Sequence, residues 1–308
     1  MKHFLRIGFL GWLYACLVLH AYGQQQAMFT QYMFNGLVLN PAYAGSHQAL
    51  SLTAVARQQW TGFDGSPSTQ TFSAHSPIGK KDIALGALFM HDRIGVTSQA
   101  GMLLSGAYQL RFRRSVLSLG AQGGVTYQRI FWEDLLLRDP ADPNFPQSTY
   151  TGIMPQVGTG LYFYSDWWYL GFSVPQLLTS SYAAAPEGSY SRQQRHYFLT
   201  GGYVFDLGQS FKLKPSVLIK AIEGAPLSID LNTNLLIKEV LWIGCSYRHR
   251  ESVAALAEVQ LTDQFRLGYS YDFVTSTQSR RVTTGSHEVM LSYRFAFAKN
   301  RLVTPRFF

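Results

Sequence analysis

The sequence predicts an all-β protein, a transmembrane antiparallel β-barrel of about 14 strands with a short N-terminal plug or brace segment. Three observations carry this prediction: two-sided strand patterns, an export signal and an aromatic-rich composition. Residues 264–274 show the pattern best, because Phe265, Leu267, Tyr269, Tyr271 and Phe273 alternate with polar residues or glycine. Successive side chains of a strand point to opposite faces. Each such strand therefore separates an apolar environment from a polar one.

The first 23 residues read as a secretory signal peptide. Lys2, His3 and Arg6 form a basic start, an apolar run covers residues 7–19, and Ala21-Tyr22-Gly23 resembles a cleavage site. The apolar run is too short to span a membrane comfortably. A lipoprotein site at Cys16 is a weaker alternative, because apolar residues continue beyond this cysteine.

Composition narrows the class of protein further. Loss of residues 1–23 would leave Cys245 as the only cysteine, which excludes an intramolecular disulfide and a multi-cysteine zinc site. Aromatic residues make up 15% and charged residues only 14% of the chain, a balance that suits a wall facing lipid. The remaining basic excess, 24 Lys and Arg against 18 Asp and Glu, is scattered and does not indicate nucleic-acid binding.

The segment from residue 24 to residue 48 does not follow the strand pattern. It contains turn signals at Asn40-Pro41 and Gly45-Ser46, and an apolar stretch at residues 32–39 that needs burial. We expect a short plug or brace inside the periplasmic mouth of the barrel. The alternative, a flexible arm, would expose Met33, Phe34, Leu37 and Leu39 to water.

Strand-like segments separated by turn signals then fill the chain. Helical periodicity is almost absent, and an even number of strands near fourteen fits a closed bacterial barrel that has no exposed sheet edges. The predicted strands are residues 50–60, 69–76, 83–91, 100–112, 116–128, 154–164, 167–174, 196–207, 211–222, 226–237, 240–248, 253–261, 265–274 and 287–297.

The lengths of the connections test this barrel prediction. With both termini in the periplasm, connections after even-numbered strands should be short and those after odd-numbered strands longer. Five even connections are brief, and the long ones, residues 130–153, 175–195 and 275–286, follow odd strands. Two odd connections, near residues 223–224 and 250–251, are short and weaken the rule without breaking it.

Alternation also assigns one face of each later strand to the lumen, provided that the aromatic face meets lipid. Mixed charges on that face favour cross-strand ion pairs in a partly filled interior over a selectivity ring of one charge sign. The alternative is a soluble β-sandwich or lipocalin-like barrel, which would need a very large core. The predicted lumen residues are Lys212, Lys214, Lys220, Asp230, Asn232, Asn234, Arg248, Glu258, Gln260, Arg266, Asp272, Glu288 and Arg294.

Candidate partner-binding residues come from two places. Arg57, Trp60, Phe63 and Asp64 lead from the first strand into the first outward loop, where Trp and Arg could form an interface. An equally good interpretation puts Trp60 in the interfacial aromatic belt, where we also expect Trp132, Trp167, Trp168 and Trp242. The Asp/Pro-rich residues 139–146 form a further candidate docking loop. The candidates in the N-terminal segment are Tyr32, Phe34, Asn40 and Pro41.

Standard catalytic signatures are missing. The sequence has no His-Glu-x-x-His, no paired cysteine ligands, no nucleotide-type glycine loop and no Gly-x-Ser-x-Gly, so we predict a non-enzymatic protein without cofactor or metal. An outer-membrane hydrolase is a third-ranked alternative, because its groups could meet only in three dimensions. Its candidate residues would be Ser73, His75, Ser76, His91, Asp92, His287 and Glu288.

Three sequence blocks resemble a known family. Residues 31–46, Q-Y-M-F-N-G-L-V-L-N-P-A-Y-A-G-S, followed by R-Q-Q-W-T-G-F-D-G-S-P at 57–67 and T-Q-T-F-S-A-H-S-P at 69–77, resemble the opening of the PorP/SprF family of Bacteroidota. G-S-H-E-V-M-L-S-Y-R-F at 285–295 resembles its last strand. One departure is the continuation through residues 298–308, which places the terminal aromatic beyond Phe297.

The resemblance implies an outer-membrane component of the type IX secretion system that serves secretion or the gliding machinery, without enzymatic activity. Expected partners are other secretion components, in the periplasm or outer membrane, or secreted surface adhesins, together with membrane lipid or lipopolysaccharide. A channel for small or hydrophobic solutes is the main alternative. The expected organisation is a signal peptide at 1–23, a plug at 24–48, a barrel at 49–297 and a tail at 298–308.

Overall fold

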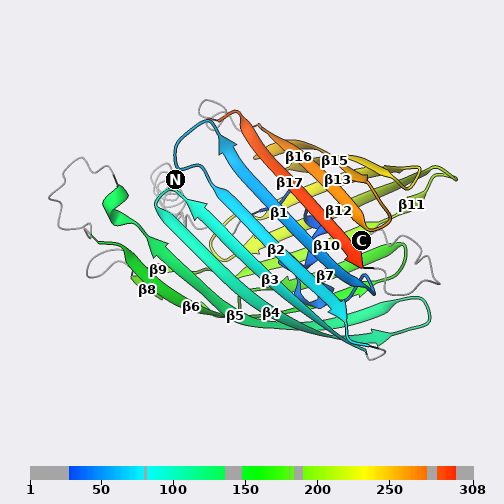
Figure 1. Cartoon of the computed structure of the whole chain (residues 1–308), viewed down its shortest axis with the longest axis horizontal. Helices are drawn as coiled ribbons and strands as arrows, with labels where there is room; N and C mark the ends of the chain where they lie inside the picture. The colour runs from blue at the N-terminus through cyan, green and yellow to red at the C-terminus, as the bar shows by residue number, and fades with distance from the viewer. Residues whose placement is uncertain are drawn as a thin grey trace, which may run out of the picture.

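A computed structural model of the chain describes residues 28–79, 82–135, 148–179, 181–183, 190–275 and 283–295. The predicted signal peptide, the docking loop at 139–146 and the tail at 298–308 lie outside these residues. Within them, regular structure consists of strands and short 3-10 turns, and the strands wind obliquely around a common axis (Figure 1). No helix in this part of the chain is long and apolar enough to cross a membrane.

The wall is a closed ring of 14 antiparallel strands, as predicted. The ring closes because β1 pairs with both β2 and β17, while β10 pairs with both β7 and β12. Its strands are β1 (Leu50–Thr61), β2 (Ser68–Pro77), β3 (Ile83–Ile94), β4 (Thr97–Arg111), β5 (Val116–Ile130), β6 (Tyr150–Tyr164), β7 (Trp168–Val174), β10 (His196–Tyr203), β12 (Phe211–Ile222), β13 (Ser228–Ile237), β14 (Leu241–Arg248), β15 (Ser252–Gln260), β16 (Phe265–Val274) and β17 (Gly285–Phe295).

Smaller elements complete the fold. β11 (Phe205–Asp206) follows β10 and pairs with β12, whereas β8 (Ser181–Ala183) and β9 (Tyr190–Arg192) form a separate two-stranded sheet. The predicted strand at 196–207 is thus interrupted at Val204. Before β1, three 3-10 turns follow one another: η1 (Tyr32–Phe34), η2 (Gly36–Val38) and η3 (Pro41–Tyr43). A fourth, η4 (Trp132–Asp134), follows β5.

The two ends of the barrel differ in their connections. We call the end where β1 begins the turn end and the end where β1 finishes the loop end, which lies at the left of Figure 1. The longest connections, 131–149, 175–195 and 275–284, are at the loop end, as expected. The connection between β3 and β4 is shorter than expected, because Gly95 takes a positive φ of 54° and lets the strands turn within two residues.

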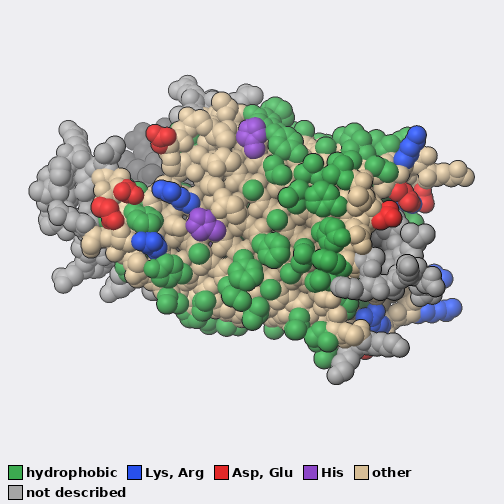
Figure 2. Space-filling model, viewed as in Figure 1, with side chains coloured by type: hydrophobic (Ala, Val, Ile, Leu, Met, Phe, Trp, Pro, Cys, Tyr) green, Lys and Arg blue, Asp and Glu red, His purple; other side chains and the backbone are tan. Residues whose placement is uncertain are grey.

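The two faces of the wall confirm the assignment of lipid and lumen. On β16, Leu267, Tyr269 and Phe273 are exposed, whereas Ser270 and Asp272 are buried. On the face shown in Figure 2, apolar side chains gather over the middle of the wall and charged side chains lie towards the two ends. A soluble fold with an aromatic core would show the opposite arrangement, so the exposed apolar band excludes that alternative.

Candidate functional site

The N-terminal segment fills the lumen. Residues 28–47 are almost all buried, and Leu37, Ala42 and Ala44 are among the least exposed side chains of the described chain. η3 contacts β4, β5 and β6, and η2 contacts β2 and β3. The plug is surrounded by the barrel wall, so its apolar side chains must be buried in several directions. Successive 3-10 turns point side chains in several directions, whereas an extended strand points them in only two. Residues 28–48, the plug, therefore extend well inside the barrel, beyond the periplasmic mouth where we expected them.

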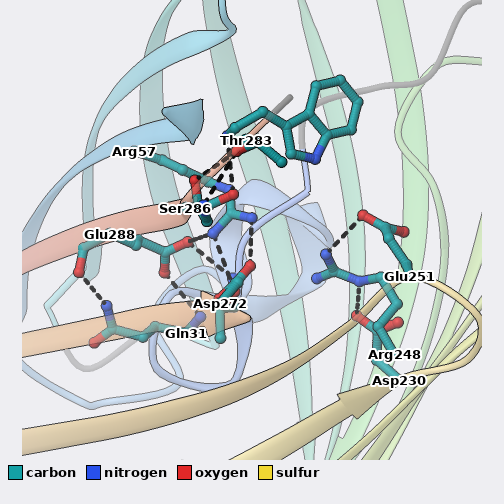
Figure 3. A network of polar contacts seen from close by, with 12 residues as sticks. Gln31, Arg57, Asp230, Arg248, Glu251, Asp272, Thr283, Ser286 and Glu288 are labelled. Carbon is teal, nitrogen blue, oxygen red and sulfur yellow. Dashed lines mark hydrogen bonds and ion pairs between the residues drawn. The ribbon is translucent and has the colours of Figure 1, made fainter. Parts of the chain in front are cut away.

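One side of the plug is held by a buried ionic clasp (Figure 3). Arg57 of β1 donates to Asp272 of β16 at 2.6 Å and to Glu288 of β17 at 3.0 Å. The two oxygens of Glu288 also accept the backbone N–H groups of Thr30 and Gln31, both at 2.8 Å. The Thr30 hydroxyl donates to Asp272 at 2.7 Å. The clasp thus joins the first strand, the last two strands and the start of the plug.

The other side of the plug is held by close backbone contact. A Cβ atom on Gly120 of β5 would lie 2.2 Å from the Ala42 nitrogen, and one on Gly160 of β6 would lie 2.1 Å from the Asn40 side-chain oxygen. Only glycine permits such an approach. Asn40 accepts the Ala42 N–H at 2.9 Å, which caps η3, and donates to the Leu161 carbonyl at 2.8 Å. We call Gly120 and Gly160 the glycine cradle; it holds the plug by close backbone packing, without charged groups.

A ring cluster lies where the plug joins the wall at the turn end. The Tyr43 hydroxyl lies 2.9 Å from His47 Nε2, and His47 Nδ1 lies 2.8 Å from the Ser51 hydroxyl. His75 Nδ1 accepts the Gly45 N–H at 3.1 Å. Burial raises the pKa of Tyr43 to about 12, so its hydroxyl keeps its proton at neutral pH. The cluster orients the chain as it enters β1.

The rest of the lumen is densely occupied by polar side chains. Lys214 lies over the rings of Phe34 and Trp242, at 4.7 and 5.5 Å from their centroids. Arg248 pairs with Asp230 at 2.9 Å and with Glu251 at 3.2 Å (Figure 3). The Arg248–Asp230 pair joins the adjacent strands β13 and β14, so charges on the lumen face form cross-strand ion pairs as predicted. Trp242 corrects one expectation, because it points into the lumen instead of joining the outer aromatic belt.

The partner-binding candidates separate into two groups. Arg57, Tyr32, Asn40 and Pro41 are buried, and Phe34 is half-buried against Trp242. Their visible contacts are intramolecular: they hold the plug. Phe63 and Asp64 are exposed at the loop end, and half-buried Trp60 adopts a φ of 52° beside a β-bulge. Such a backbone angle is strained for a tryptophan.

The structure does not bring the hydrolase candidates together. His91 is exposed and contacts Gln70 and Ser98, whereas His75 is buried in the lumen. His287 contacts Tyr269 at 2.8 Å on the outer face, while its neighbour Glu288 belongs to the clasp. Ser73 donates to Asn35 of the plug. Within the described ranges, no three His, Cys, Asp or Glu side chains could hold a metal ion together.

Sequence reasoning found the lumen residues but missed how they are paired. Arg57 was expected to lead from the first strand into an outward loop, but it lies within β1 and faces the lumen. Its place in the strand alternation was the available signal, since Val55 and Thr53 before it also face inward. Gly120 and Gly160 carried no recognisable signal, because a glycine in a strand has several explanations.

Solved structures of outer-membrane proteins resemble this barrel. The CymD monoaromatic hydrocarbon channel has a TM-score of 0.51 and 10% identity, over 89% of this chain and 94% of that one. A FadL homologue from Pseudomonas aeruginosa has a TM-score of 0.48 and 12% identity, over 90% and 96%. Omp33 from Acinetobacter baumannii has a TM-score of 0.47 and 8% identity, over 80% and 98%. At this identity, CymD shows the barrel fold alone.

Comparison of the sequence is more specific. No protein with a curated description matches the chain. The family described as "Type IX secretion system membrane protein PorP/SprF" matches residues 21–293, which include the plug and every strand up to most of β17. The chain therefore belongs to the PorP/SprF family of type IX secretion system membrane proteins.

Proposed function

We propose that this protein is a non-enzymatic docking platform in the outer membrane, which anchors type IX secretion components or secreted surface proteins. Residues 1–23 would direct its export and then be removed. The apolar outer band keeps the protein in the membrane, while the loops and the two barrel mouths supply contacts. Secretion or gliding would depend on what it holds.

The occupied lumen is the observation that carries this proposal. A pore needs a continuous path for water or solute, whereas here the plug is buried and held from two sides by the clasp and the glycine cradle. Removing the plug would leave the buried carboxylates of Glu288 and Asp272 without the hydrogen bonds that Thr30 and Gln31 donate to them. A fixed plug favours a platform over the alternative, an open channel for small or hydrophobic solutes.

The loop end offers the first docking surface. Phe63 and Asp64 are exposed beyond the end of β1. The strained backbone of Trp60 is held by a hydrogen bond from its backbone N–H to the Ser286 hydroxyl at 3.0 Å. A strained residue at an exposed loop is consistent with a binding role. Trp60, Phe63 and Asp64 are therefore the residues that we propose for partner contact.

The test is gentle extraction of the protein from its native outer membrane, followed by identification of co-purifying chains. We expect a type IX component or a secreted adhesin to accompany the wild type, and Trp60→Ala with Phe63→Ala to reduce its recovery. Val125→Ala, a change on the lipid-facing wall, is the matched control and should recover the partner fully. Intact secretion and gliding in a deletion strain would contradict the proposal.

Conductance separates the platform from the channel. We expect purified wild-type protein in a planar bilayer to show no steady open current. A stable current of uniform size from the wild type would favour the channel.

A further inference from the structure

β6 extends further towards the loop end than β7, its neighbour in the ring. β6 pairs with β5 along its whole length, from Tyr150 opposite Ile130 to Tyr164 opposite Val116. It pairs with β7 only from Thr159 to Tyr164, because β7 ends at Val174. Among the described residues, no strand pairs with residues 150–158 on that side. Residues 150–156 therefore have no described strand beside them on that side, and we call them the free edge; just beyond them, the chain after β7 reaches Val157 and Gly158.

The backbone groups that face this edge can be identified. The Val157 carbonyl points to it, since it accepts the Leu177 N–H at 2.7 Å. Backbone groups alternate between the two edges of a strand, so the N–H and C=O of Thr151 and Ile153 point the same way. Pro155 has no N–H to offer there, and proline within a sheet is confined to such edges. The sequence is thus consistent with an edge that no strand of the described ranges pairs with.

The free edge lies at the loop-end margin of the apolar band, where Thr151 pairs with the exposed Arg129 of β5 and Ile153 pairs with Tyr127. Ile153, Val157 and Leu161 all face outward on β6 and are exposed by 72%, 43% and 47%. Ile153 is the most exposed of the three, and no strand of the described residues lies beside it on the side away from β5. Backbone groups without hydrogen bonds are costly in contact with lipid. The edge therefore favours an occupant that supplies both donors and acceptors.

A recess lies on the lumen side of the same edge. Its lining includes Phe29, Val38 and Leu39 of the plug, Leu88 and Met90 of β3, and Gln156 of β6. None of the residues around it is charged. A strand added to the edge would point alternate side chains into this recess and into lipid.

We infer that the free edge of β6 binds an extended, uncharged segment of a partner polypeptide by β-strand addition. The inference deepens the proposed docking role and rests on it for the identity of the partner. An acyl chain could fill the recess but could not form hydrogen bonds with the backbone N–H and C=O groups of the edge. In a second copy with the same orientation in the membrane, each residue of its β6 edge would lie opposite the identical residue of the first copy. Backbone N–H groups would then face N–H groups and could not form hydrogen bonds.

The test uses the purified full chain in lipid nanodiscs and amide hydrogen exchange. We expect the Thr151 and Ile153 amides to exchange quickly and the neighbouring Gly152 and Met154 amides, which face β5, to exchange slowly. The probe is a ten-residue synthetic peptide of alternating Val and Thr. Its addition should slow exchange at Thr151 and Ile153. The same peptide N-methylated at alternate residues is the control and should have no effect.

Two variants separate the backbone from the side chain. Ile153→Pro removes one N–H from the free edge without touching the β5 ladder, and should weaken peptide binding about five-fold, the effect of one hydrogen bond. Ile153→Ala keeps that N–H and should bind as the wild type does. Equal binding by Ile153→Pro and the wild type would overturn the inference.

Three other occupants would give distinct results, and each of these three results would overturn the inference. Slow exchange at Thr151 and Ile153 in the monomeric protein alone would mean that the chain covers its own edge. Protection that rises with protein concentration would assign the edge to a second copy. Binding of laurate, without any change in amide exchange when the peptide is added, would assign the recess to an apolar solute. Peptide protection without any co-purifying partner would leave the edge site intact and remove the proposed platform role.

Discussion

The plug is held by different chemistry on its two sides. Towards β16 and β17, the contacts are ion pairs and hydrogen bonds to charged groups, with Arg57, Asp272 and Glu288 at the centre. Towards β5 and β6, the inner residues are uncharged, and Gly120 and Gly160 let the plug backbone touch the wall. The ion pairs and charged hydrogen bonds determine which groups of the plug and the wall meet. The glycines leave the space into which the plug backbone fits. Together they fix one position for a segment that has no long helix or strand of its own.

The largest expected effect comes from breaking the clasp. Arg57→Met leaves Asp272 and Glu288 buried without their cation, and should lower the free energy of unfolding by about 3–5 kcal/mol. Urea unfolding of the barrel in lipid measures this change. Arg111→Met is the control, because its ion pair with Asp82 is exposed and contributes about 0–1 kcal/mol. Similar losses for both variants would show that the clasp is no stronger than a surface pair.

A smaller effect should follow from filling the glycine cradle. Gly120→Val places a side chain where the Ala42 backbone lies, and should cost about 1–3 kcal/mol in the free energy of unfolding. Because the clash is with backbone, we also expect the plug to shift and ion conductance to appear in planar bilayers. Gly106→Val is the control, since no atom lies within 4 Å of its Cβ position. An unchanged plug in Gly120→Val would refute the cradle.

Asn40 tests how much the cradle gains from its hydrogen bonds. Asn40→Ala loses both the cap of η3 and the bond to the Leu161 carbonyl, and should cost about 0.5–2 kcal/mol of unfolding free energy. Asn40→Ser keeps a hydroxyl acceptor for the Ala42 N–H but loses the amide donor to the Leu161 carbonyl, so its loss should be intermediate. Equal losses for the two variants would assign the whole effect to the bond with Leu161.

The smallest effect at neutral pH is expected at Tyr43. Tyr43→Phe removes the contact with His47 and should cost about 0.5–1.5 kcal/mol. In alkali the wild type should weaken, because the folded pKa of about 12 lies above the value near 10 of an exposed tyrosine. This contribution is complete below pH 10 and is lost as the pH rises towards 12. Equilibrium unfolding between pH 8 and 12 should show a shallower decline for Tyr43→Phe.

Much of the wall followed from the sequence, because alternation is a local property. The lipid side of Phe265–Val274 and the inward direction of Lys214, Asp230 and Glu258 needed only the period of two. The start of β6 at Tyr150 was missed by four residues, since Gly152 and Pro155 obscure its pattern.

The clasp and the depth of the plug could not be read in this way. Arg57 faces Asp272 and Glu288 only because the ring brings β1 beside β17, across more than 200 residues of chain. The glycine cradle depends on which backbone passes over Gly120, and local pattern contains no information on that distance.

The position of the clasp has a consequence for assembly. Arg57 belongs to the first strand and Glu288 to the last, so the clasp spans the seam at which the sheet closes on itself. The start of the plug, Thr30 and Gln31, binds the same carboxylate. Until β17 arrives, the plug lacks this anchor and Arg57 lacks its counter-charge. We therefore expect closure of the seam and seating of the plug to be a single cooperative step, with an empty, closed barrel absent from the folding pathway.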